Sequence, residues 1–278
     1  MLKRTFIHAE GIGPATEKKL WDAWIHTWDH FLARLREVKL PNRKLERLTP
    51  LLEESLLAIR RRDVGFLGTR LKSSDQWRMY GEFATQAAFV DIETTGLSPE
   101  FDQITVVGLL AGGHFHAFVQ GSNLDKFSDA IAKFPLVVTF NGAQFDLQFL
   151  RRRFPQFNPL AHIDLRYALS KLGHKGGLKQ IERKLGIIRP EHLREVDGYE
   201  AVRLWSAHRR GTAGALDRLV EYCRHDVVNM KPLAERVAAE MPKVAGVTTP
   251  LLPSVELHRP LRECSIHPPS IDGKGGPR

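Results

Sequence analysis

The feature that most constrains the fold is the segment 87–93, an apolar run that ends in two acids. Its length and apolar side chains are typical of a strand buried in a sheet. Two more apolar segments, 103–111 and 114–120, flank the pair Gly112-Gly113, a pattern that predicts a hairpin. A short apolar run at 136–140 predicts another strand. The chain therefore contains a sheet from residue 87 onward.

The same region carries helical periodicity, in which apolar residues recur every three or four positions. The predicted helices cover 124–134, 144–152, 165–172, 177–186, 198–209 and 213–240. Strands followed by a helical second half predict an α/β fold, in which helices flank a mixed sheet, for a domain over 87–240.

The segments on either side differ in composition. Residues 5 to about 62 have apolar side chains at helical spacing, which predicts a small all-α domain over 1–62. Residues 63–86 carry few signals and are interpreted as a connector packed on one domain or the other. Residues 241–278 are rich in proline and glycine, so we expect a largely disordered tail.

Composition excludes several classes of protein. No apolar run approaches the roughly 18–20 residues that span a bilayer, and no apolar stretch follows the basic N-terminus as in a secretory signal. Cys223 and Cys264 lie far apart, so we expect no structural disulfide and a reducing, cytoplasmic location. The net charge is +9, and residues 1–80 carry an excess of six positive charges. Such an excess attracts nucleic acid, although it also serves solubility alone.

Asp91 and Glu93 stand two positions apart at the end of the first strand, so both carboxylates lie on one face of the sheet. Two buried acids repel each other, and a divalent metal ion with oxygen ligands is the simplest compensation. The alternative is a pair of exposed acids where the strand meets a turn.

Two further acids follow the later elements. Asp146 falls in the first turn of a predicted helix, where the helix dipole alone explains an acid. Tyr222 and Asp226 are four positions apart and share one face of the last helix, beside an apolar stripe of Leu219, Cys223 and Val227. A phenol one turn from a carboxylate can orient a water molecule, but such pairs also arise by chance.

The order of these pieces resembles the DEDD exonucleases of the ribonuclease-H-like fold. The first motif is 89–97, the second is 139–146, and the third runs from Tyr222 to Asp226. The histidine subtype would need histidine at Glu221, so the chain resembles the tyrosine subtype. The resemblance covers about residues 87–240.

The resemblance implies a two-metal mechanism with Mg²⁺ or Mn²⁺, which suit an all-oxygen site. Asp91 would bridge both ions, Glu93 and Asp226 would complete one site, and Asp146 would hold the other. Tyr222 would orient the attacking water. The resemblance also implies removal of nucleotides from a 3′ end of DNA or RNA. Residues assigned to nucleic-acid binding near the motifs are Thr94, Leu97 and Asn141.

Two residues outside the motifs have more than one interpretation. Asp164 precedes a predicted helix, and we favour an N-cap over a fifth metal ligand. Lys179, in the segment 175–179, is assigned to phosphate contact, although the segment also serves to start a helix.

The segment 6–21 resembles a helix-hairpin-helix motif. Gly11 and Gly13 flank an apolar residue and permit a tight turn, and Pro14 suits the start of the next helix. Backbone amides there can bind a phosphate, with Lys18 and Lys19 nearby. The alternatives are a purely structural turn or a protein-docking module. Together with a tyrosine-type nuclease domain, the hairpin resembles the YprB-type group of bacterial ribonuclease-H-like proteins.

The sequence therefore predicts a metal-dependent 3′–5′ exonuclease that acts on a single strand or 3′ end of DNA or RNA. Two rivals stay open. One is an endonuclease of the same fold, and the other is a non-catalytic nucleic-acid-binding or scaffold protein, which has no need of four converging carboxylates.

Overall fold

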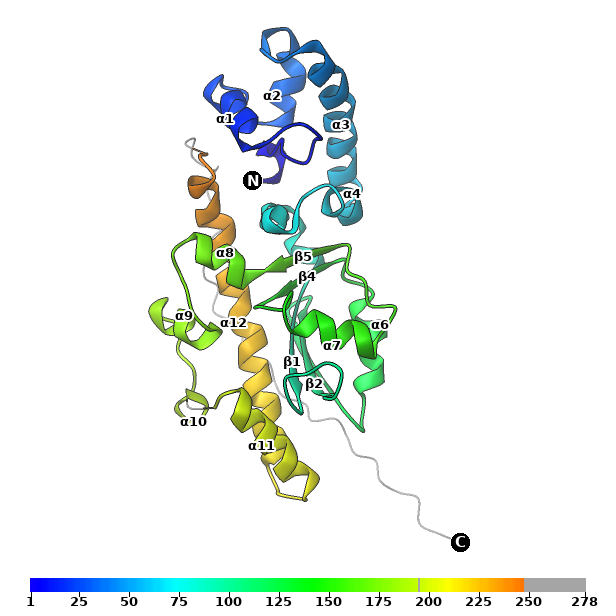
Figure 1. Cartoon of the computed structure of the whole chain (residues 1–278), viewed down its shortest axis with the longest axis vertical. Helices are drawn as coiled ribbons and strands as arrows, with labels where there is room; N and C mark the ends of the chain where they lie inside the picture. Colours follow the sequence, from blue (N-terminus) through cyan, green and yellow to red (C-terminus); the bar gives the residue numbers. More distant parts are fainter. Residues whose placement is uncertain (195, 248–278) are drawn as a thin grey trace. The chain divides into compact units, whose positions relative to one another are not determined.

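A five-stranded sheet with the order β3-β2-β1-β4-β5 forms the centre of the region from residue 87 onward (Figure 1). The computed structural model describes residues 1–194 and 196–247. The strands are β1 (Ala87–Thr94), β2 (Ile104–Ala111), β3 (His114–Val119), β4 (Leu136–Thr139) and β5 (Ala161–Asp164). The pairs β1–β2 and β2–β3 are antiparallel, whereas β1–β4 and β4–β5 are parallel. This mixed sheet confirms the predicted α/β class.

Alternation along β1 decides which of its side chains face the last helix. Ala88, Val90 and Ile92 are buried in a cluster with side chains of α6 and α7. Ala87 and Phe89 are buried in a different cluster, which contains side chains of α12. Because side chains of a strand alternate between its two faces, Asp91 and Glu93 lie on the α12 face.

The hairpin between β2 and β3 has the predicted turn. Gly112 and Gly113 both have positive φ, at 58° and 83°, which glycine adopts without steric cost. Strand β5 was not predicted from the sequence. It is four residues long and contains His162 and Asp164, so it shows neither an apolar run nor a clear alternation.

Helices cover both faces of the sheet. Contacts of α12 with β1, β2, β3 and β4 place it across one face, together with α8 and α11. The helices of this region are η5 (Leu124–Lys126), α6 (Phe127–Ile131), α7 (Asp146–Arg153), α8 (Leu165–Lys171), α9 (Leu178–Lys184), α10 (Glu191–Arg194), α11 (Gly198–Arg209) and α12 (Ala215–Val244). The predicted helix over 198–209 matches α11, whereas the short α10 was not predicted. The last helix continues to Val244, into the predicted tail, and the rest of that tail from residue 248 lies outside the described residues.

The N-terminal region is helical, but it begins later than predicted. Its elements are η1 (Leu2–Arg4), α1 (Pro14–Asp22), α2 (Trp28–Ala33), η2 (Leu35–Glu37) and α3 (Asn42–Arg60). The expectation of helix from residue 5 is wrong for residues 5–13, which form turns. Thr5 and Phe6 donate hydrogen bonds to the Glu17 carboxylate at 2.9 and 2.6 Å instead of joining a helix.

The connector consists of short buried helices that contact both regions. They are α4 (Val64–Gly68), η3 (Ser73–Met79), α5 (Tyr80–Phe83) and η4 (Ala84–Gln86). Arg78 of η3 forms a buried ion pair with Glu17 at 3.1 Å, and Gln76 accepts a hydrogen bond from the His162 amide at 2.6 Å. The boundaries at residues 62 and 86 remain a prediction. Across 1–194 and 196–247, no helix has the length and apolar character needed to cross a membrane.

Candidate active site

Asp91 and Glu93 approach each other on the α12 face of β1. One carboxylate oxygen from each lies within 4.8 Å of the other and of the Cys223 Sγ atom. Glu93 is only 6% exposed, and its Oε1 atom is buried without a hydrogen-bond partner. An unpaired buried carboxylate oxygen is costly, so this position fits a cation. The acids are therefore not the exposed pair of the alternative interpretation.

Helix α12 brings Tyr222 and Asp226 against these acids. Both side chains are buried, and the adjoining apolar stripe of Leu219, Cys223 and Val227 is fully buried. The close approach depends on Gly108, which pairs with Asp91 across β1 and β2. A Cβ atom at Gly108 would lie 2.7 Å from the Cys223 Sγ atom and 2.8 Å from a Val227 methyl group. Gly108 therefore lets α12 pack directly over the strand that carries the acids.

Asp146 reaches the cluster from the first residue of α7. It is only 3% exposed, and the Ile92 backbone of β1 lies close enough to its carboxyl group to lower the pKa of that group. The turn before it needs Gly142, because a Cβ atom there would lie 2.2 Å from the Thr139 hydroxyl. The helix start explains the acid's local position, and the contact with β1 places it among the other acids.

The acids influence one another strongly. Burial raises the pKa values of Asp91 and Glu93 well above their usual range, and the negative charges of Asp226 and Asp146 raise them further. Burial likewise raises the pKa of Asp146 to about 7, with a contribution from the nearby charge of Asp164. In the absence of a cation, part of this cluster therefore retains protons near neutral pH.

Asp226 has a cationic neighbour that the sequence did not reveal. Arg189 is buried, forms an ion pair with Asp226, and donates two hydrogen bonds to Glu182 at 2.6 and 2.7 Å. Asn229 of α12 donates to the same Glu182 carboxylate at 3.1 Å. Burial raises the pKa of Asp226, and the Arg189 charge opposes that rise. No motif marks Arg189, because it lies between α9 and α10 and its partner Asp226 is distant in sequence.

Residues expected to contact nucleic acid lie in different settings around the acids. Lys179 stands over the Tyr222 ring, with its Nζ atom 4.5 Å from the ring centroid, so it does reach the site. Leu97 is 84% exposed in the loop after β1, whereas the Thr94 side chain is buried and donates to the Gly96 carbonyl at 2.5 Å. Asn141 has a φ of 65°. Its side chain accepts a hydrogen bond from Arg166 at 2.8 Å.

Asp164 has the predicted capping role. Its carboxylate accepts a hydrogen bond from the Arg166 amide at the start of α8, and further ones from the Asn141 and Ala143 amides. These bonds also fix the turn that leads to Asp146. The sequence offered no partner for His192, but its Nε2 atom lies 3.0 Å from the Glu221 carboxylate.

The N-terminal hairpin has part of the predicted geometry. Gly11 has a φ of 77°, and Gly13 caps α1, with Pro14 as its first residue. Lys18 forms an ion pair with Asp22 at 2.7 Å, and both Lys18 and Lys19 are exposed. The helix expected before the hairpin is limited to the short η1 and the turns that follow it. A hollow of about 300 Å³ beside the hairpin is lined in part by two cations, Lys44 and Arg47.

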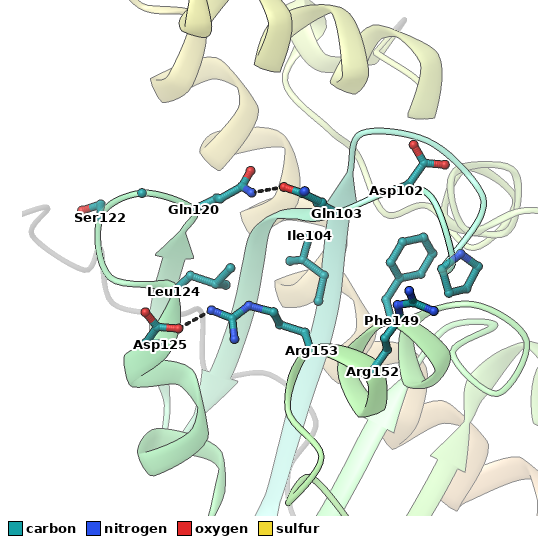
Figure 2. Close-up of a pocket in the computed structure, with 12 residues that line it drawn as sticks. Asp102, Gln103, Ile104, Gln120, Ser122, Leu124, Asp125, Phe149, Arg152 and Arg153 are labelled. Atoms are coloured by element: carbon teal, nitrogen blue, oxygen red, sulfur yellow. Dashed lines mark hydrogen bonds and ion pairs between the residues drawn. The ribbon is translucent and has the colours of Figure 1, made fainter.

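A larger hollow of about 610 Å³ contains none of the acids of the site. Figure 2 shows its lining, which comes from the loop before β2 and the start of that strand, the loop after β3, η5 and α7. Arg153 pairs with Asp125 across it, and Gln120 donates to Gln103. Because these polar groups pair with one another, the lining of the hollow has no buried carboxylate oxygen without a hydrogen-bond partner like that of Glu93. The volume of a cavity therefore does not locate this site.

Comparisons with known proteins concern mainly the sheet and its helices. A sequence model of the RNase H superfamily matches residues 88–238. An uncharacterized protein of Methanocaldococcus jannaschii is 29% identical over 160 residues, which cover 50% of this chain and 88% of that protein. The family B DNA polymerase of Pyrobaculum calidifontis gives a TM-score of 0.45 at 16% identity, covering 54% of this chain and 24% of the polymerase chain. The Mg²⁺-bound NrnC of Brucella melitensis gives 0.31 at 20% identity, covering 61% and 91%. The superfamily match contains all four carboxylates.

Proposed function

The chain belongs to the RNase H superfamily, and on this premise we propose that it is a metal-dependent 3′–5′ exonuclease of the tyrosine DEDD type. The observation that carries the proposal is the convergence of four carboxylates around a Glu93 oxygen that has no hydrogen-bond partner. Two cations, Arg189 and Lys179, lie close to the four acids, so uncompensated negative charge remains.

The donor set fits divalent cations. Asp91, Glu93, Asp146 and Asp226 offer carboxylate oxygens, the ligands that Mg²⁺ and Mn²⁺ prefer. Cys223 belongs to the same cluster, but burial raises the pKa of its thiol well above the usual range. A thiolate is a soft ligand, and Mg²⁺ and Mn²⁺ prefer oxygen ligands, so we assign Cys223 to packing. When bound, two such cations stabilise the charge that develops on the attacking and leaving oxygens of a phosphodiester.

Side chains of this chain orient the attacking water and contact the substrate. Tyr222 is held one turn from Asp226, and burial raises its pKa above the usual range, so its hydroxyl stays protonated. It can therefore hold an attacking water by a hydrogen bond without giving up its own proton. Arg189 fixes the orientation of Asp226 through the Glu182 pair. We assign Lys179 to contact with a phosphate oxygen and the exposed Leu97 to contact with a terminal base.

The N-terminal region completes the proposal. The hairpin at Gly11 and Gly13 presents backbone amides to phosphates, which suits binding that does not depend on base sequence. This arrangement supports membership of the YprB-type group.

The test uses single-stranded DNA and RNA labelled at the 5′ end, with Mn²⁺ and either free or blocked 3′ ends. We expect stepwise shortening of strands with free ends and none of blocked strands. Cleavage that ignores the block would assign the chain to the endonucleases. Asp91→Ala should abolish hydrolysis while binding persists, and Tyr222→Phe is the matched variant that removes only the hydroxyl. Turnover unchanged in Asp91→Ala would refute the site, and a wild-type chain that binds without hydrolysis would be a binding protein.

A further inference from the structure

Six helices in the described ranges end in the same way, with one residue of positive φ just after the C-cap. That residue and the next donate hydrogen bonds back to the last turn, as at the ends of α1, α3, α8, α9, α11 and α12. Glycine favours this position because a side chain makes the left-handed conformation costly. Four of the six ends have glycine, namely Gly173, Gly186, Gly211 and Gly246. The two exceptions are Arg62 and Trp24.

Arg62, after α3, has a structural reason for its side chain. Its φ is 59°, and its guanidinium donates to the Glu82 carbonyl at 2.8 Å and to the Thr85 hydroxyl at 2.6 Å. The same group lies 5.5 Å from the centroid of the Phe83 ring. These contacts tie α3 to the connector, which glycine would not do.

Trp24, after α1, lacks such a reason. Its φ is 64°, and its side chain is 71% exposed. Its ring meets the edge of the His26 ring at 5.6 Å, and its backbone makes the same hydrogen bonds that glycine would make. A bulky residue in this conformation is rare, and exposure of an indole adds to the cost. Folding of α1 therefore does not explain the tryptophan.

Trp24 lies in the basic part of the chain, since residues 1–80 carry an excess of six positive charges. The His26 ring lies 6.3 Å from the His30 ring, and burial together with the Arg4 charge lowers the pKa of His26. Trp21 donates to the Arg4 carbonyl at 2.9 Å, which holds that residue beside α1. The nearest acid in the sequence, Asp22, is neutralised by Lys18. An exposed aromatic face in a basic region complements a nucleic-acid strand, whose bases stack and whose phosphates are anionic.

We propose that Trp24 is a stacking platform for a base of single-stranded nucleic acid. The proposal rests on the proposed function in one respect, because the strand is taken to be the nuclease substrate. Helix α1 has nine residues, so Trp24 lies about 14 Å from the hairpin glycines. The two sites are therefore distinct, and one strand reaches both.

The test measures binding without hydrolysis, in EDTA, on the full chain. Trp24 is the exposed member of the five tryptophans, since Trp21, Trp28, Trp77 and Trp205 are buried. Quenching of intrinsic fluorescence by oligo-dT or oligo-U about 12 nucleotides long should therefore report stacking on Trp24. Anisotropy of a labelled oligonucleotide then gives the affinity of each variant.

Three variants separate binding from folding. Trp24→Gly should weaken binding by about 10-fold and raise the melting temperature by about 2 °C, because the strained residue is replaced by the favoured one. Trp24→Phe should bind within about threefold of the wild type because it keeps an aromatic face. Arg62→Gly is the matched control. This substitution also replaces a side-chain-bearing residue of positive φ by glycine, but it removes the contacts of the Arg62 guanidinium. It should therefore lower the melting temperature and leave binding unchanged.

Several outcomes would overturn the proposal. They are wild-type affinity in Trp24→Gly, no quenching in the wild type, or burial of Trp24 by self-association at increasing protein concentration. The last outcome would assign this surface to a second copy of the chain. Failure here is distinguishable from failure of the proposed function, because hydrolysis with Mn²⁺ is measured separately. If the wild type hydrolyses substrate and Trp24→Gly binds the oligonucleotide as tightly as the wild type, only the stacking proposal is refuted.

Discussion

Glu17 in the N-terminal region and Glu93 in β1 are both buried, with exposed fractions of 1% and 6%, but their surroundings are opposite. Glu17 is surrounded by donors, because it accepts hydrogen bonds from Thr5 and Phe6 and pairs with Arg78. Glu93 is surrounded by other acids, and one of its oxygens has no hydrogen-bond partner. A buried acid with donors holds a structure together, whereas a buried acid among acids fits a cation.

The largest effect is expected from Glu93→Gln, which keeps the shape of the side chain and removes its charge. Loss of one metal ligand should reduce Mn²⁺-dependent hydrolysis about 1,000-fold or more. The metal-free protein should melt at a higher temperature, because repulsion within the cluster falls. Hydrolysis and thermal unfolding of the same preparation check both results. Activity near the wild-type level would remove Glu93 from the site.

Glu17→Gln should have the opposite effects, lowering stability and leaving hydrolysis unchanged. The change removes the closer of the two acids that pair with buried Arg78 and leaves only Asp75 at 3.7 Å, so the free energy of unfolding should fall by about 3 kcal/mol. Urea unfolding measures this loss. Hydrolysis per folded molecule should stay at the wild-type level, and a specific loss of turnover would show that the two glutamates do not have separate roles.

The pH dependence of stability should also distinguish the two regions. The pKa of Asp146 rises from its ordinary 3.8 to about 7 in the folded protein. The folded protein then holds a proton that the unfolded chain has released, so this contribution to stability is full below about pH 4 and lost as pH rises through 7. In EDTA, the melting temperature of the wild type should fall over this range by about 5 °C more than that of Asp146→Asn. If the melting temperatures of the wild type and Asp146→Asn fell equally with rising pH, the raised pKa of Asp146 would be contradicted.

Cys223→Ala should have the smallest effect. The thiol packs against Gly108 and lies 3.9 Å from an Asp91 oxygen, but it is assigned no part in the chemistry. We expect a loss of about 1 kcal/mol in the free energy of unfolding and turnover within about threefold of the wild type. A loss of turnover as large as that of Glu93→Gln would make the thiol a ligand.

The sequence predicts the acids and the sheet because both leave local patterns. Asp91 and Glu93 end an apolar run, and Gly112-Gly113 marks the hairpin turn, so periodicity and turn chemistry suffice. Arg189 was not predictable, because its partners Glu182 and Asp226 come near it only when α9 and α12 pack. The conformation of Trp24 is likewise invisible in the sequence, since φ is set by how α1 ends. Strand β5 is too short to show a period.

The Glu17–Arg78 pair illustrates the same limit for domain organisation. Composition separates residues 1–62 from the connector, but this contact joins them across 61 residues of sequence. The helix expected before the hairpin was lost for a related reason, since Thr5 and Phe6 bond to Glu17 instead of to a helical turn. Long-range partners decide such positions, and single-sequence patterns do not record them.

Calorimetric titration of Mn²⁺ into the protein at pH 8, with a mononucleotide present, tests the cation site directly. The wild type should bind two ions and release protons, because acids with raised pKa values must ionise when they take up a cation. Asp91→Asn should lose tight binding of both ions while it keeps the wild-type melting temperature or exceeds it. Equal stoichiometry and affinity in the wild type and in Asp91→Asn would contradict a metal site built from these four carboxylates.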